Sequence, residues 1–173
     1  MTEVYFFYDE TQNAEKQELS FLAHRFVNLK AGANLTTLKT ENGKPYFKEL
    51  PDFHFNISHT KGALAIAFSD YPVGVDTERL KNPDLRVAKR FFTKEENEYI
   101  NHDPEHHFFE IWTKKEAYIK KNGLSLKNLS FAKVEKVRTF FVENYAISVC
   151  CEDINNITLH TKSLDDLRKF LEN

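Results

Sequence analysis

Segments with helical spacing alternate with strand-like segments along the whole chain, and this alternation limits the folds that the chain can adopt. In residues 13–29, apolar side chains recur every three or four positions, as on one face of a helix. Runs rich in aromatic and β-branched residues predict strands at 4–8, 36–40, 53–59, 63–68, 73–76, 129–137, 140–142, 145–151 and 157–161. Since both halves mix helices with strands, we predict an α+β fold built on antiparallel sheets.

Helix-capping residues and turns divide the middle of the chain. Asp103 and Pro104 are typical first residues of a helix, and Gly123 is a typical stop, so we predict a helix from Pro104 to Asn122. Shorter helices are expected at 82–90 and 164–171. Because a short polar turn separates the runs 63–68 and 73–76, we predict that they form a hairpin.

Composition excludes several classes of protein. The 173 residues are 41% hydrophobic and 29% charged, which is ordinary for a compact globular chain and unlike disordered or collagen-like ones. A net charge of −2 gives no chain-wide basic field, so we expect neither nucleic acid nor a membrane as partner. No apolar run approaches the about 20 residues of a membrane span, and a cytoplasmic location is expected. The adjacent Cys150 and Cys151 are interpreted as small buried hydrophobes.

Three acidic residues stand out by their placement. Asp76 and Glu78 lie two apart at the end of an apolar strand, so both carboxylates face the same side. Converging carboxylates suit a hard cation such as Mg²⁺, although taken alone the pair is more often two solvated acids. Glu116 and Lys120 continue a helical stripe that begins with aromatic residues, as on a helix that enters a polar cleft. The alternative for these two is a weak surface ion pair.

Groups that commonly bind phosphate lie upstream. Lys44 and Pro45 follow Gly43 in a turn, and Ser58 and His59 end a strand with a hydroxyl and an imidazole. None of these residues is specific alone. The other histidines are interpreted as structural or solvated.

The order of these motifs carries more information than any one of them. Gly43-Lys44-Pro45, Asn56-Ile57-Ser58-His59, Gly74-Val75-Asp76-Thr77-Glu78, Phe91-Phe92 with Glu96, and Trp112 with Lys115-Glu116-Ala117 and Lys120 follow one another. This succession resembles the 4′-phosphopantetheinyl transferase superfamily, and within it the two-lobed type that activates peptide and polyketide synthetases. The resemblance runs from about residue 43 to residue 126, nearly half of the chain.

The resemblance implies a pseudo-dimer of two similar α+β lobes, residues 1–71 and 72–173, with coenzyme A in the cleft between them. It implies transfer of 4′-phosphopantetheine from coenzyme A to a serine of an apo acyl or peptidyl carrier protein, with release of adenosine 3′,5′-bisphosphate. The cofactor implied is Mg²⁺, with Mn²⁺ as the alternative, and the two-lobed form implies a monomer.

The resemblance also assigns roles to individual residues. The metal ligands it implies are Asp76, Glu78 and Glu116. The residues it places around coenzyme A are Lys44, Pro45, Ser58, His59, Asp76, Lys115 and Lys120. Glu116, Lys120 and Glu96 are the catalytic candidates, and Glu116 acting through a water is favoured over Glu96 as the base.

Departures from the family pattern define the remaining questions. Only 42 residues precede Gly43, so the basic residues that grip the nucleotide 3′-phosphate in longer members are not matched; the possible substitutes are Lys16, Arg25 and Lys30. A basic cluster of Arg86, Lys89 and Arg90 either docks an acidic carrier protein or is a solvated helix face. Two alternatives to the transferase stay open, a non-catalytic relative that binds coenzyme A or a carrier and a metal-dependent phosphoanhydride hydrolase.

Overall fold

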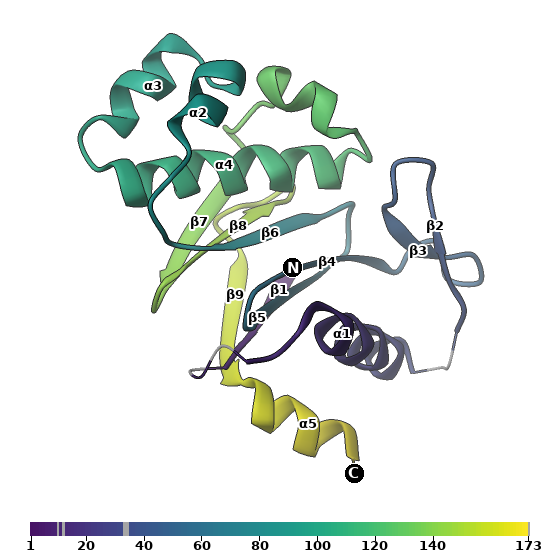
Figure 1. The fold of residues 1–173 in the computed structure, drawn as a ribbon. Helices are drawn as coiled ribbons and strands as arrows, with labels where there is room; N and C mark the ends of the chain where they lie inside the picture. The colour runs from purple at the N-terminus through teal and green to yellow at the C-terminus, as the bar shows by residue number, and fades with distance from the viewer. Residues whose placement is uncertain (10, 12, 33–34, 173) are drawn as a thin grey trace.

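The structure is a computed structural model, and it describes residues 1–9, 11, 13–32 and 35–172. It confirms a mixed α+β fold (Figure 1). The helices are α1 (Lys16–Ala31), α2 (Leu85–Phe91), α3 (Lys94–Ile100), α4 (Pro104–Lys121), α5 (Leu164–Glu172) and the 3₁₀ helix η1 (Leu126–Phe131). The strands are β1 (Thr2–Tyr8), β2 (Thr37–Lys39), β3 (Pro45–Phe47), β4 (His54–Thr60), β5 (Ala63–Ser69), β6 (Gly74–Arg79), β7 (Val137–Val142), β8 (Tyr145–Cys150) and β9 (Ile157–Ser163).

The strands of the described residues form three sheets. A four-stranded sheet has the order β4-β5-β1-β9, in which β1 and β9 are parallel and the other pairs are antiparallel. A three-stranded antiparallel sheet has the order β6-β8-β7, and β2 pairs with β3 in a small antiparallel ribbon. The prediction of antiparallel sheets is thus confirmed for every pair except β1 and β9.

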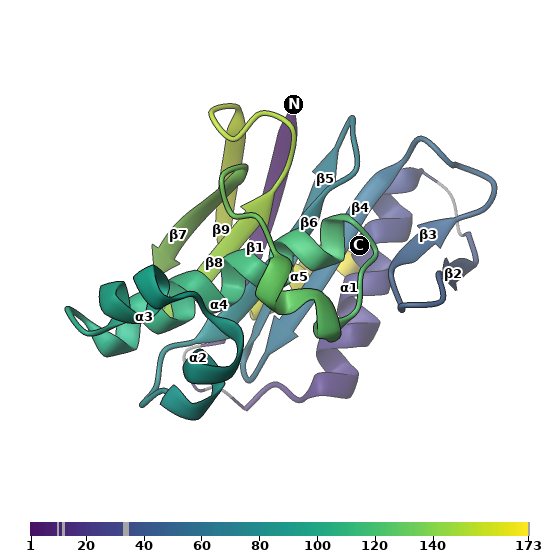
Figure 2. The same ribbon diagram turned by 90° about the horizontal axis from the view of Figure 1, so that it is seen from above.

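The two larger sheets are stacked between two layers of helices. Helices α1 and α5 cover the outer face of the four-stranded sheet, whereas α4 lies against the three-stranded sheet, with α2 and α3 on the far side of α4 (Figures 1 and 2). Between the sheets lies an apolar core to which Val4 and Phe6 contribute from one sheet and Val75 and Ile147 from the other. Alternate residues of a strand face opposite sides. One set of side chains on β6 and β8 therefore packs in this core, and the other set contacts α4.

Helix α4 forms as its capping residues predict. The Asp103 side chain accepts a hydrogen bond from the His106 amide, Pro104 is the first helical residue, and Gly123 takes a left-handed conformation with φ of 62° beyond the end. The Gly123 and Leu124 amides donate to the carbonyl groups of Lys120 and Ile119, which satisfies two of the free carbonyls of the last turn. In the described part of the chain, no helix is long and apolar enough to span a membrane.

The hairpin predicted for residues 63–76 is wrong. Strand β5 pairs with β4 through a tight turn at Lys61 and Gly62, and β6 crosses to the other sheet and pairs with β8. Gly62 has φ of 73°, which a short turn between antiparallel strands requires and which glycine adopts at little cost. The longer link through residues 70–73 therefore joins the two sheets instead of two neighbouring strands.

The strand predicted for residues 129–137 is also wrong over most of its length. Leu126–Phe131 is the 3₁₀ helix η1, and the strand β7 begins only at Val137. Leu129 is fully buried in the core next to α4 and anchors this short helix, while Phe131 is 79% exposed. Strand β3 was not predicted. Cys150 and Cys151 are buried and unpaired, as expected of small hydrophobes.

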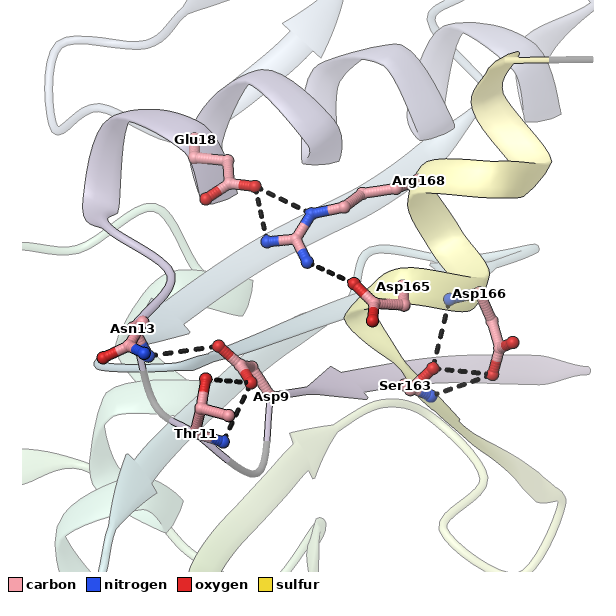
Figure 3. Close-up of polar contacts among 8 residues, drawn as sticks. All are labelled: Asp9, Thr11, Asn13, Glu18, Ser163, Asp165, Asp166 and Arg168. Atoms are coloured by element: carbon pink, nitrogen blue, oxygen red, sulfur yellow. Dashed lines mark hydrogen bonds and ion pairs between the residues drawn. The ribbon is translucent and has the colours of Figure 1, made fainter.

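The end of the chain returns to its beginning. Strand β9 lies beside β1, and α5 contacts α1, where the Arg168 guanidinium donates to Glu18 at 2.6 and 2.9 Å (Figure 3). Asp166 and Ser163 cap the start of α5 through their side chains. Residues 157–172 are thus part of the layer built on the N-terminal sheet. The division into lobes at residues 71 and 72 stays a prediction.

Candidate active site

A glycine allows strand β6 and helix α4 to approach closely. A Cβ atom placed on Gly74 would lie 2.1 Å from the Ala117 carbonyl oxygen and 2.4 Å from the Lys121 amide nitrogen, so only glycine fits. Every second residue of β6 faces the same way as Gly74. The two acids predicted to share a face, Asp76 and Glu78, therefore point toward α4 and its residues Glu116 and Lys120.

Asp76 is the most enclosed of these acids, with 4% of its surface exposed. Its Oδ1 atom accepts a hydrogen bond from the Ser58 hydroxyl at 2.8 Å and one from the Lys120 ammonium at 2.6 Å. Its Oδ2 atom is buried and has no hydrogen-bond partner within the described residues. The interpretation of Asp76 as a solvated surface acid is therefore wrong, and Lys120 forms its ion pair with Asp76 instead of with a surface glutamate.

The two glutamates respond to burial and to the charge of Asp76. Burial, with Asp76 as the next cause, raises the pKa of Glu116 to about 7. Burial and the Asp76 charge also raise the pKa of Glu78, which accepts a hydrogen bond from the Thr60 hydroxyl at 3.2 Å. Both shifts have the same physical cause, because carboxylates that share a partly buried site repel one another and are poorly solvated.

This arrangement can be stabilised by a proton or by a positive charge in addition to Lys120. A buried carboxylate oxygen without a partner costs on the order of 1–3 kcal/mol, and more when the group is charged. Three carboxylates form an all-oxygen donor set of the kind that Mg²⁺ prefers. Over the described residues, no group of three or more acidic, histidine or cysteine side chains is placed to hold a metal ion as it stands. The donor set and the free Oδ2 atom of Asp76 nevertheless fit a divalent cation.

A cavity of about 470 Å³ opens beside Glu116 and Lys120 of α4. Its walls also include Lys44, Pro45 at the start of β3, and apolar side chains such as Leu124. The Lys44 ammonium donates to the Lys121 carbonyl oxygen, and the Asn42 amide donates to the Gly123 carbonyl oxygen at 2.8 Å. Burial lowers the pKa of Lys44, and the charge of Lys121 adds to the effect. The cavity thus combines cationic groups with an apolar wall.

A second cavity, of about 570 Å³, lies on the other side of the end of β4. His59 and Thr60 line it together with Lys16 and Lys61. Burial lowers the pKa of His59, and the neighbouring charges of Lys16 and Lys120 act in the same direction. His59 thus lies near the ammonium groups of Lys16 and Lys120. It is not among the residues that line the first cavity.

The other two candidates for the 3′-phosphate are engaged elsewhere. Arg25 donates to the Leu171 carbonyl oxygen, and Lys30 donates to the Tyr5 hydroxyl while lying over the Tyr5 ring. The first contact belongs to the packing of α1 on α5, and the second to the packing of α1 on β1. Of the three proposed substitutes, the structure places Lys16 at the cavity that His59 lines.

Lys115 and Glu96 form a separate pair. Lys115 is 1% exposed, its Nζ atom lies 3.0 Å from Glu96 Oε1, and the Phe92 ring lies nearby. The second oxygen of Glu96 accepts a hydrogen bond from the Thr93 amide at the start of α3. No contact joins either residue to the Asp76 network within the described residues, although Lys115 neighbours Glu116 in the sequence.

The basic cluster on α2 is exposed. Arg86 forms an ion pair with Asp84, which caps the helix, and Arg90 lies over the Phe91 ring. Lys89 is also exposed. These contacts are local and suit either of the two interpretations given above.

Sequence reasoning assigned no role to two residues of the site, Asn56, which it named only within a motif, and Thr60. The Asn56 side-chain oxygen accepts a hydrogen bond from the Val75 amide at 2.9 Å, and Thr60 contacts Glu78 as described. A signal was available, because Asn56, Ser58 and Thr60 alternate along one strand and must share a face. What that face meets could not be inferred from periodicity.

Comparisons with known proteins agree on one family. A protein-family model described as the 4′-phosphopantetheinyl transferase superfamily matches residues 72–168. The curated 4′-phosphopantetheinyl transferase psf-1 of Bacillus pumilus is 43% identical over 86 residues, which are 47% of this chain and 37% of that protein. 4′-Phosphopantetheinyl transferase Sfp of Bacillus subtilis (strain 168) is 41% identical over 90 residues, 50% of this chain and 40% of its own length.

A third relative, 4′-phosphopantetheinyl transferase gsp of Aneurinibacillus migulanus, is 43% identical over 96 residues, 52% of this chain and 39% of that protein. The matched part of the chain therefore spans less than half the length of each of these relatives.

Proposed function

The chain belongs to the 4′-phosphopantetheinyl transferase superfamily, and we propose that it transfers the 4′-phosphopantetheine group of coenzyme A to a serine of an apo carrier protein. One observation carries the proposal. Within the described residues, Asp76 has a buried carboxylate oxygen with no partner and an ion pair with Lys120, and Glu116 and Lys120 line a cavity with cationic and apolar walls. Such a site suits a ligand that joins a diphosphate to an organic arm.

The metal ligands in this proposal are Asp76, Glu78 and Glu116. A divalent cation, Mg²⁺ before Mn²⁺, would supply positive charge to the diphosphate and to the negative charge that develops during transfer. Burial and then the charge of Asp76 raise the pKa values of Glu78 and Glu116, and this supports the assignment because a cation among these carboxylates would offset both causes.

Coenzyme A would lie along the 470 Å³ cavity. Lys44 and Lys120 would supply positive charge to its phosphates, and Pro45 would keep the turn that carries Lys44 rigid. Asp76 would act on the diphosphate only as a ligand of the cation. His59 with Lys16 would receive the 3′-phosphate in the second cavity. Contacts of Ser58 and Lys115 with coenzyme A stay predictions, because both side chains are bonded within the protein.

The reaction needs a base for the serine hydroxyl of the carrier. The hydroxyl oxygen attacks the phosphorus that bears the pantetheine, the bond to the leaving phosphate breaks, and adenosine 3′,5′-bisphosphate departs. Glu116 lies beside the cavity and would accept the hydroxyl proton through a water molecule. Lys120 stabilises the added negative charge. Glu96 as an alternative base stays a prediction.

The proposal extends to the architecture and the partners. We propose that residues 1–71 and 72–173 form two related lobes of a pseudo-dimer, with coenzyme A between them and the last strand and helix returning to the first lobe. The exposed cluster of Arg86, Lys89 and Arg90 would dock an acidic carrier protein. A monomeric state and a cytoplasmic location remain predictions.

Intact-mass spectrometry of an apo carrier protein tests the function. The carrier is incubated with this protein, coenzyme A and Mg²⁺, and a parallel sample contains chelator. We expect a mass gain of one phosphopantetheine that chelator abolishes, and an Asp76→Asn variant slower by about a hundredfold or more. The Ser69→Ala variant, which removes a half-buried hydroxyl at the far end of β5, is the control and should react as the wild type does.

The same experiment separates the alternatives. Cleavage of coenzyme A without modification of any carrier would favour the phosphoanhydride hydrolase. Binding of coenzyme A with neither cleavage nor transfer, across acyl and peptidyl carriers, would contradict the transferase and favour a non-catalytic relative.

A further inference from the structure

Three alternate residues of strand β4 contact strand β6 in register. Asn56, Ser58 and Thr60 occupy every second position, so their side chains leave the same face of β4. Asn56 meets Val75, Ser58 meets Asp76 and Thr77, and Thr60 meets Glu78. These strands belong to different sheets, and no ladder of backbone hydrogen bonds joins them among the described residues.

The first part of this contact satisfies the free edge of β6. Strand β6 pairs with β8 on one side only, so alternate amides point away from its sheet. Two of these amides find acceptors on side chains: Val75 N–H donates to Asn56 Oδ1 at 2.9 Å, and Thr77 N–H donates to Ser58 Oγ at 3.3 Å. Side chains of β4 thus accept the hydrogen bonds that the backbone carbonyl groups of a neighbouring strand would otherwise accept.

The second part of the contact reaches the carboxylates. The Ser58 hydroxyl donates to Asp76 Oδ1, and the Thr60 hydroxyl donates to Glu78 Oε2. Ser58 also accepts from Lys120 at 2.9 Å, so its one donor and both of its acceptor positions are in use. Since Oδ1 of Asp76 takes the donors from Ser58 and Lys120, its Oδ2 atom is left without one.

We propose that Asn56, Ser58 and Thr60 form a side-chain ladder that positions Asp76 and Glu78 for a divalent cation. The ladder takes the place of a strand along the edge of β6 and turns one oxygen of Asp76 toward the protein, which leaves the other for the cation. Thr60 orients Glu78 in the same way. The role toward the cation rests on the proposed function; the structural role does not.

Amide hydrogen exchange measured by NMR tests the ladder without any ligand. In Asn56→Ala, we expect exchange of the Val75 amide to accelerate at least about tenfold while that of Thr77 changes little. Ser58→Ala should accelerate Thr77 instead, and Thr60→Val should accelerate neither. Ser69→Ala, which removes a hydroxyl from the neighbouring strand β5, is the matched control. Equal rates in wild type and variants at both amides would overturn the ladder.

Binding of Mn²⁺ alone, followed by calorimetry, tests the positioning of Glu78. We expect Thr60→Val to weaken Mn²⁺ binding by about tenfold, as loss of a side chain that orients a metal ligand does elsewhere, and Thr60→Ser to restore it to within about twofold. Unchanged affinity in Thr60→Val would overturn the positioning role.

The two readouts separate this inference from the proposed function, because neither needs coenzyme A or a carrier protein. The expected exchange pattern in a protein that transfers no phosphopantetheine would support the ladder and contradict only the transferase. Normal transfer together with unchanged exchange would contradict only the ladder.

Discussion

Two polar regions of this molecule use similar residues in opposite ways. Between α1 and α5, Arg168 joins Glu18 and Asp165, and Asp166 caps its helix, all near the surface (Figure 3). Between β4, β6 and α4, Asp76 forms an ion pair with Lys120 and is only 4% exposed.

The regions differ in how completely their charges are satisfied. In the surface region, the contacts are local caps and ion pairs that solvent can replace at little cost. In the buried region, a carboxylate oxygen has no partner within the described residues, and the pKa values of two glutamates are raised. Buried charge that packing alone does not satisfy is an indicator of function, since it persists only where it serves one.

The largest expected effect comes from breaking the buried ion pair of α4. Lys115→Met leaves Glu96 without its cation in a place that is largely closed to water. We expect the free energy of unfolding to fall by about 3 kcal/mol, measured by urea denaturation. If Lys115 only contacts coenzyme A, the variant will instead keep its stability and lose affinity for coenzyme A.

A somewhat smaller effect is expected at the contact between β6 and α4. Gly74→Ala forces a methyl group against the Ala117 carbonyl and the Lys121 amide, so the strand and helix must separate. Overpacking of this kind costs about 1–3 kcal/mol, measured by denaturation. Gly43→Ala is the control, since its φ of 83° causes strain but its Cβ meets no atom within 4 Å. An equal loss of stability in both variants would show that the close approach adds nothing to the cost of backbone strain.

The pH dependence of stability should report on Glu116. Its pKa is about 7 in the folded protein, above the ordinary glutamate value of 4.5. A carboxyl with a raised pKa binds its proton more tightly when folded, so it favours folding at pH below 4.5 and loses that contribution as the pH rises to 7.

In the presence of chelator, the stability of Glu116→Gln should therefore rise relative to wild type between these pH values, by on the order of 1–2 kcal/mol after allowance for partial exposure. Denaturant unfolding at a series of pH values measures the difference. A difference that does not vary with pH would show that Glu116 is not buried among like charges.

The smallest effect is expected at the surface. Arg168→Met removes the same kind of charge from an ion pair as Lys115→Met does, but its side chain is 34% exposed. We expect a loss of no more than about 1 kcal/mol by urea denaturation, and unchanged phosphopantetheine transfer. A loss as large as that of Lys115→Met would show that the exposed ion pair contributes as much to stability as the buried one.

Particular residues show how far prediction from the sequence reached. The shared face of Asp76 and Glu78 and the helical stripe of Glu116 and Lys120 follow from local periodicity, and the structure confirms both. Asn56 and Thr60 lie on a predictable face of β4, yet nothing in the sequence shows that this face meets β6. Lys115 was grouped with its neighbour Glu116, although a helix turns successive residues about 100° apart and carries Lys115 to Glu96.

Helix capping and side-chain alternation depend on residues that are close together in the chain. The α+β class, the ends of α4, the faces on which the acids lie and the motifs of the family could therefore be predicted from the sequence alone. Only the tertiary structure decided that β6 leaves β5 for β8, that β9 lies parallel to β1, and that Lys120 pairs with Asp76. These partners lie far apart in the chain. They are selected by which apolar faces can be buried together, and local sequence does not encode that choice.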